Sequence, residues 1–143
     1  MSKRIDNIDL IIATRDLCKH IMVDNDINMS VFEVGYPTKK TCNNLPDEFL
    51  VVKSIVQRDT GDPKSEGAVE ICIYVANRTL GADQSQANLS RIKQLTGIFV
   101  SGLQDASKNR VAFNDFRTTL VRDSDIGYFY QSIVINTVSI NLV

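Results

Sequence analysis

The chain has 143 residues, of which 43% are hydrophobic and 23% charged, and this balance excludes a disordered chain. The length predicts one domain, residues 1–143, large enough to bury a core without disulfides or metals. The formal charge is −1, from 16 basic and 17 acidic residues, so the chain lacks the basic surplus typical of nucleic-acid-binding proteins. We therefore expect no specific nucleic-acid binding.

Apolar residues at helical spacing predict a first helix over residues 4–23. Its apolar surface spans more than half of the circumference, which suits a helix with two partners, its own sheet and an outside protein. A helix tucked deep within a single core would explain the pattern equally well. The apolar rows consist of Ile5, Ile8, Ile12, Leu10, Leu17 and Ile21.

Three strands are predicted next, over residues 29–36, 48–57 and 69–76. Residues 49–52 are apolar on both faces, which is typical of a central strand covered on both sides. Polar, turn-forming residues predict a surface loop at 38–46 and a long hairpin tip at 58–67.

A second helix is predicted from Gln84 or Ser85 to about Ser107, after a connector at 77–83. Its Gly97 and Gly102 either weaken it or permit close approach of a neighbouring backbone. Residues 111–121 are ambiguous, an irregular segment with a strand around 117–121. The order α-β-β-β-α-β-β predicts an α+β fold, an antiparallel sheet with two helices packed on one face.

The chain ends in one long alternating strand, which follows the acidic turn Arg122-Asp123-Ser124-Asp125-Ile126-Gly127. The alternation predicts that Val138, Ile140 and Leu142 face the core. The opposite face is polar but uncharged, which suits contact with another protein. That face carries Thr137, Ser139 and Asn141.

The sequence offers little catalytic chemistry. Serine and cysteine triads both need the single His20, which falls on the polar side of the first helix and is expected to face solvent. Cys18, Cys42 and Cys72 lie too far apart for a zinc motif and predict free thiols in a reducing compartment. Acidic pairs lie in turns, and no glycine-rich phosphate loop occurs. We expect neither enzyme activity, cofactor nor metal.

Tyr128-Phe129-Tyr130 is the one aromatic cluster in the sequence. Core packing and sheet pairing explain it most simply, and an interface anchor is the alternative. The amino-terminal segment turns acidic at once and lacks a long apolar run, so we expect neither a signal peptide nor a membrane span.

The predicted hairpin, the following helix and the terminal strand after residues 122–127 together resemble the tail-terminator family of long-tailed bacteriophages. The resemblance covers nearly the full chain in element order and spacing. It implies a structural virion protein of the tail or neck, assembled in the host cytoplasm. Such proteins form a ring, usually a hexamer, that ends the tail tube and joins it to the head connector.

The resemblance implies three partners: further copies of the chain, the tail tube protein and a head-completion or connector protein. The candidate interface residues lie in the hairpin tip and the terminal strand: Arg58, Asp59, Asp62, Lys64, Glu66, Thr137, Ser139 and Asn141. Two alternatives remain open, another phage neck or connector ring protein and a small cytoplasmic α+β adaptor that binds one protein.

Overall fold

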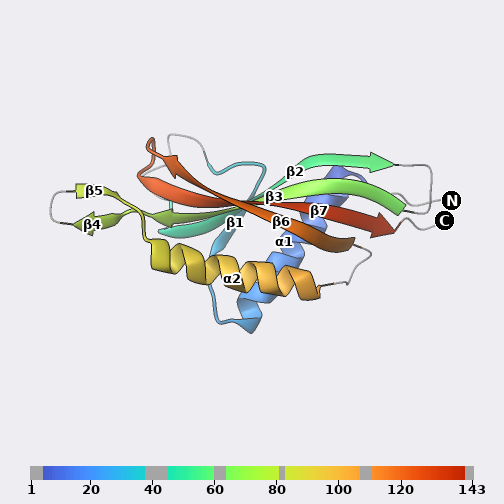
Figure 1. Cartoon of the computed structure of the whole chain (residues 1–143), viewed down its shortest axis with the longest axis horizontal. Helices are drawn as coiled ribbons and strands as arrows, with labels where there is room; N and C mark the ends of the chain where they lie inside the picture. Colours follow the sequence, from blue (N-terminus) through green and yellow to red (C-terminus); the bar gives the residue numbers. More distant parts are fainter. Residues whose placement is uncertain (1–4, 38–44, 60–63, 81–82, 107–110, 141–143) are drawn as a thin grey trace.

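The computed structural model describes residues 5–37, 45–59, 64–80, 83–106 and 111–140. A five-stranded sheet in the order β1-β2-β3-β7-β6 forms its centre, and β4 and β5 form a separate two-stranded hairpin (Figure 1). The elements are α1 (Asn7–Asp24), β1 (Ser30–Glu33), β2 (Glu48–Asp59), β3 (Lys64–Ala76), β4 (Arg78–Leu80), β5 (Asp83–Gln86), α2 (Leu89–Asp105), β6 (Val111–Asp123) and β7 (Tyr128–Ile140).

The predicted α+β class and the order α-β-β-β-α-β-β are confirmed, with the β4–β5 hairpin as an addition between the third strand and the second helix. Every pairing in the large sheet is antiparallel except that of β1 with β2. The long strands β3 and β7 pair from Lys64↔Ile140 to Ala76↔Tyr128, so the terminal strand lies in the middle of the sheet.

Local signals fix where each helix begins. The Asp6 side chain accepts from the backbone N–H of Asp9, whose carboxylate accepts from the N–H of Asp6, a reciprocal cap that starts α1. The side chain of Asn88 accepts from the backbone N–H of Arg91 and starts α2. The predicted start of the second helix at Gln84 or Ser85 is therefore wrong, because residues 83–86 pair with β4 instead.

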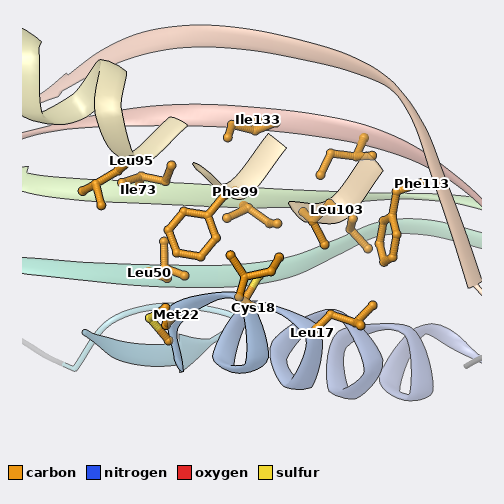
Figure 2. Packing of buried hydrophobic residues seen from close by; sticks show 14 of the residues in the cluster. Leu17, Cys18, Met22, Leu50, Ile73, Leu95, Phe99, Leu103, Phe113 and Ile133 are labelled. Carbon is orange, nitrogen blue, oxygen red and sulfur yellow. The ribbon is translucent and has the colours of Figure 1, made fainter. Parts of the chain in front are cut away.

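The main core lies between the helices and one face of the sheet, which we call the helix face. Figure 2 shows Phe99 and Leu103 of α2, Leu17 of α1, and Leu50 and Ile73 of the sheet in one packed cluster. Six of the strand residues in this core have no exposed surface: Leu50, Val69, Ile71, Ile73, Ile133 and Ile135. Burial of apolar surface on this scale is what holds the two layers together.

The two helices approach closely at Gly102. A β-carbon placed there would lie 2.6 Å from Cγ1 of Ile21 in α1, too near for any real contact. Gly102 therefore permits the close approach of a neighbouring side chain and not, as the sequence predicted, of a neighbouring backbone. Gly97 differs, since nothing lies within 4 Å of the corresponding position.

The predicted polar tip at 58–67 is mostly strand. Arg58 pairs with Glu66 and Asp59 with Ser65, so only residues 60–63 remain between the strands, outside the described residues. Residue 64 onward of β3 also pairs with β7 along its whole length. Pairing on both sides keeps β3 extended there despite its polar composition, because context overrides strand propensity. The ambiguous segment 111–121 is likewise one strand, β6, interrupted by a bulge between Asn114 and Arg117.

The predicted facing of the terminal strand is wrong. Thr137 is 2% exposed and Ser139 is 0% exposed, whereas Ile140 is 57% exposed. Ile133 and Ile135 belong to the helix-face core, and β7 pairs with β3 in one continuous register. Since side chains alternate strictly along a strand, Thr137 and Ser139 follow the two isoleucines onto the helix face. Leu142 lies outside the described residues.

Candidate interaction surfaces

The hairpin residues proposed as an interface lie at one end of the sheet. Arg58 and Glu66 are directly opposite each other, 3.5 Å apart between Nη2 and the carboxylate, with 72% and 55% of their side chains exposed. Lys64 is also exposed, and Asp59 is the last residue of β2. Asp62 lies outside the described residues. Such exposed ion pairs contribute at most about 1 kcal/mol, so Arg58 and Glu66 are free to serve a surface role.

The terminal-strand residues proposed as an interface are placed differently. Thr137 and Ser139 are buried on the helix face, and none of the described residues bonds to their hydroxyl oxygens. Neither side chain is exposed for contact with a partner. The prediction that they form an interface is therefore wrong for both, and Asn141 lies outside the described residues.

A second, smaller core covers part of the other face of the sheet, which we call the open face. Phe49 stacks on Tyr74 with ring centroids 4.6 Å apart, and Tyr74 stacks on Tyr130 at 4.5 Å. Tyr128 is buried in this core, and its hydroxyl donates to the backbone carbonyl oxygen of Pro46 at 2.6 Å. This packing of Tyr128 and Tyr130 favours the interpretation of the aromatic cluster as core over the interface alternative.

The sequence pattern contained a signal for this second core. Aromatic residues alternate with the apolar residues of the main core, as in Phe49 beside Leu50 and Tyr74 beside Ile73. Phe129 packs instead against the main core on the helix face. Burial raises the pKa of the phenol groups of Tyr74, Tyr128 and Tyr130. All three hydroxyls therefore stay protonated at neutral pH and can donate hydrogen bonds.

Four exposed apolar side chains lie either on the first turns of α1 or near the end of β2. Ile8 is 60% exposed and Ile12 39%, so the first helix is not tucked deep within a single core. Ile55 and Val56 are each 53% exposed. A shallow hollow of about 410 Å³, lined by residues 5–7 and 54–57, joins the start of α1 to this part of β2. We call Ile8, Ile12, Ile55 and Val56 the apolar strip.

The strip continues onto the open face. Val56 also lines a hollow of about 490 Å³ together with Ala68 and Val138. Ile140, 57% exposed, ends β7 at the same end of the sheet (Figure 1). Exposed apolar side chains therefore occur on α1, near the end of β2 and on the open face of β7.

An open groove of about 910 Å³ lies between α1 and α2. His20, Asp24 and Lys93 lie on its walls, and His20 is exposed, as the sequence predicted. No nucleophile with a base and an orienting partner meets there. Across the described ranges, no three His, Cys, Asp or Glu side chains are placed to hold a metal ion. In the same part of the chain, no helix is long and apolar enough to cross a membrane.

Two of the cysteines are free and buried, namely Cys18 in the main core and Cys72 in the aromatic core. Burial raises the pKa of each thiol to about 12. A thiol that stays protonated at neutral pH is neither a nucleophile nor a metal ligand. Cys42 lies outside the described residues.

The raised thiol pKa values predict a loss of stability in alkali. Unfolding lowers each pKa to its ordinary value near 9, so the unfolded chain releases protons that the folded chain retains. The free energy of unfolding should be unaffected by these groups below about pH 8.5 and should fall between about pH 9 and 12. Urea denaturation across that range measures it. A Cys18→Ala variant, less stable at neutral pH, should show a weaker alkaline decline, and an equal decline would contradict the assignment to this thiol.

Together these features define an α+β domain with both helices on one face of its sheet and with exposed apolar side chains on α1 and at one end of the sheet. No protein-family model matches the sequence, and no curated protein matches it.

Proposed function

We propose that the protein is a phage tail terminator, a structural virion component that forms a ring of six copies on the head-proximal end of the tail tube. The ring ends tube growth and offers its other side to the head connector. The proposal starts from the resemblance of the chain to that family. The α+β fold and its element order agree with what the resemblance implies.

The observation that carries the proposal is the apolar strip together with Val138 and Ile140 on the open face. A ring built by one rotation needs two different surfaces on each copy, because each contact joins unlike patches. Ile8 and Ile12 lie on a helix, whereas Val138 and Ile140 lie on the opposite side of the sheet, so the chain presents two unlike apolar patches at one end. Exposed apolar groups gathered in this way are typical of protein interfaces.

Two other roles use the same surfaces. A ring protein at another station of the phage neck would need the same pair of patches. A monomeric adaptor would need only one of them, and its mass in solution with a single partner would distinguish it from a ring.

The test is electron microscopy of purified tail tubes mixed with the protein. We expect a ring on the tube end, and we expect Ile8→Glu combined with Ile55→Glu to leave most tube ends bare. Both positions are more than half exposed, so each charge should change the free energy of unfolding by less than about 1 kcal/mol. The melting temperature therefore stays near that of the unchanged protein.

Val23→Glu is the matched control. Val23 is 74% exposed at the far end of the same helix, outside the apolar strip, and its variant should cap tubes normally. Bare tube ends at saturating unchanged protein would refute the proposed role. Normal capping by the double variant would refute the role of the apolar strip.

A further inference from the structure

The outer edge of β6 is a long, regular strand edge that no strand among the described residues covers. β6 is the last strand of the sheet, and its residues 117–123 pair with β7 without interruption, from Arg117↔Val134 to Asp123↔Tyr128. None of the described strands pairs with the other side of β6. Natural proteins usually protect such an edge with proline, a bulge or charged side chains. Residues 117–123 contain no proline and no bulge, and their charged side chains, Arg117, Arg122 and Asp123, are of both signs.

A bulge limits the regular edge on one side. The register shifts between Asn114 and Arg117, and Asp115 has a φ of 57°, a left-handed backbone that interrupts any extended pairing. On the other side the turn at 124–127 ends the strand. The part of β6 that can accept another strand is therefore the segment from Arg117 to Asp123.

We propose that this edge pairs antiparallel with the same edge of a second copy of the chain, centred on Leu120. In this register Arg117 lies opposite Asp123 of the second copy, and the reverse pair forms across the two-fold axis. Side chains of odd-numbered residues here share the open face, so each Arg–Asp pair lies on one side of the joined sheet. Opposite charges facing each other across two strands stabilise the pairing.

The neighbouring registers lack this match. Centred on Thr119, the pairing places Arg117 opposite Val121 and Leu120 opposite Thr118. Centred on Val121, it places Asp123 opposite Thr119 and Leu120 opposite Arg122. Each of these two registers keeps paired side chains on the same face of the joined sheet, but neither places an acidic residue of one strand opposite a basic residue of the other. Charge therefore selects the register centred on Leu120.

The apolar side chains beside the edge support the same pairing. Leu120 is 43% exposed on the helix face, and Leu89 at the start of α2 is 59% exposed. Both line one hollow of about 490 Å³ between α2 and the edge. A two-fold axis through Leu120 brings two copies of Leu120 together and places two of these hollows beside them. Dimer formation would then remove four exposed leucine side chains, two from each copy, from contact with water, and this burial favours association.

The dimer is independent of the proposed ring. It joins like surfaces, whereas a ring of one rotational symmetry joins unlike ones. The apolar strip lies on β2 and α1, with β3 and β7 between β2 and β6, and Val138 of β7 lies opposite Ala112, outside the segment from Arg117 to Asp123. The two-fold pair is therefore a state of the free protein, in which the exposed edge of β6 is covered before any assembly on a tail.

Sedimentation equilibrium of the full chain tests the pairing by its mass. We expect a concentration-dependent rise toward twice the monomer mass of 16.0 kDa. Arg117→Asp places like charges opposite each other in both symmetric pairs and should raise the dimer dissociation constant about tenfold. Arg117→Asp combined with Asp123→Arg restores opposite charges and should return the constant to within about threefold of the unchanged protein.

Two further variants keep the result decisive if Arg117→Asp unfolds the chain, which circular dichroism would show. Leu120→Glu puts two carboxylates on the axis and should also give monomers. Arg58→Asp is the matched control, because Arg58 is an exposed arginine of β2, which β3 and β7 separate from β6, and this variant should leave the dimer intact. A monomer at every accessible concentration overturns the proposal, and so does a dimer that survives both Arg117→Asp and Leu120→Glu. Neither result bears on tube capping.

Discussion

Ser139→Glu should unfold the protein, whereas Ile140→Ala should change its free energy of unfolding by less than about 1 kcal/mol. Ser139 has no exposed surface on the helix face, between Ser65 of β3 and Val111 of β6, which are both buried. A carboxylate there loses its water and gains no cation, at a cost of several kcal/mol. The whole stability of a typical domain is only about 5–15 kcal/mol. Ile140 is 57% exposed and loses little on truncation.

Urea denaturation followed by circular dichroism measures both variants. Ser139→Ala is the control for size, and it should be nearly neutral because none of the described residues bonds to the Ser139 hydroxyl. A folded Ser139→Glu protein with an unfolded Ile140→Ala protein would restore the facing that the sequence alone suggested. It would also contradict the continuous register of β7.

The terminal strand shows why a local pattern was misleading. Val138, Ile140 and Leu142 are apolar and Thr137, Ser139 and Asn141 are polar, so the last six positions by themselves indicate the wrong buried face. Which face is buried was already decided upstream by Ile133 and Ile135, whose phase cannot change without a bulge. Two small hydroxyl residues fit on the helix face because the neighbours there are themselves partly small or polar, such as Ser65.

The hairpin and β6 show a second limit of sequence reasoning. Residues 58–67 are polar enough to suggest a loop, but pairing to a neighbour on each side supplies backbone hydrogen bonds that composition does not reveal. In β6 a bulge shifts the alternation midway, so no single period fits residues 111–121. The helices and the central strands were predictable because their periodicity is uninterrupted and reflects one buried face.

The candidate surfaces divide in the same way. The wide apolar surface of the first helix, with Ile8 and Ile12, was visible in the sequence as an excess over one stripe. The edge of β6 was not, because an edge exists only once strand order is known, and order depends on contacts between distant residues. The aromatic core likewise requires β2, β3 and β7 to be neighbours before Phe49, Tyr74 and Tyr128 can meet.

Phe99→Ala should lower the free energy of unfolding by about 3–5 kcal/mol, because it removes a large side chain from the centre of the main core. Phe99 has no exposed surface, and Figure 2 shows its ring lying between α2 and the strand residues Leu50 and Ile73. The cavity would lie where α1, α2 and the sheet meet, and both helices depend on that junction. For a chain of this length the loss corresponds to a fall in melting temperature of about 10–20 °C.

The matched control is Leu89→Ala in the same helix. Leu89 is 59% exposed, so its truncation should cost less than about 1 kcal/mol, while the proposed β6 dimer should weaken because Leu89 flanks its axis. Calorimetry gives the melting temperatures, and sedimentation gives the dimer constants. If Phe99→Ala melted within a few degrees of the unchanged protein, the phenyl side chain of Phe99 would not be the centre of the core. The packing of the helices on the sheet would then depend mainly on Leu95 and Leu103, the two fully buried leucines of α2.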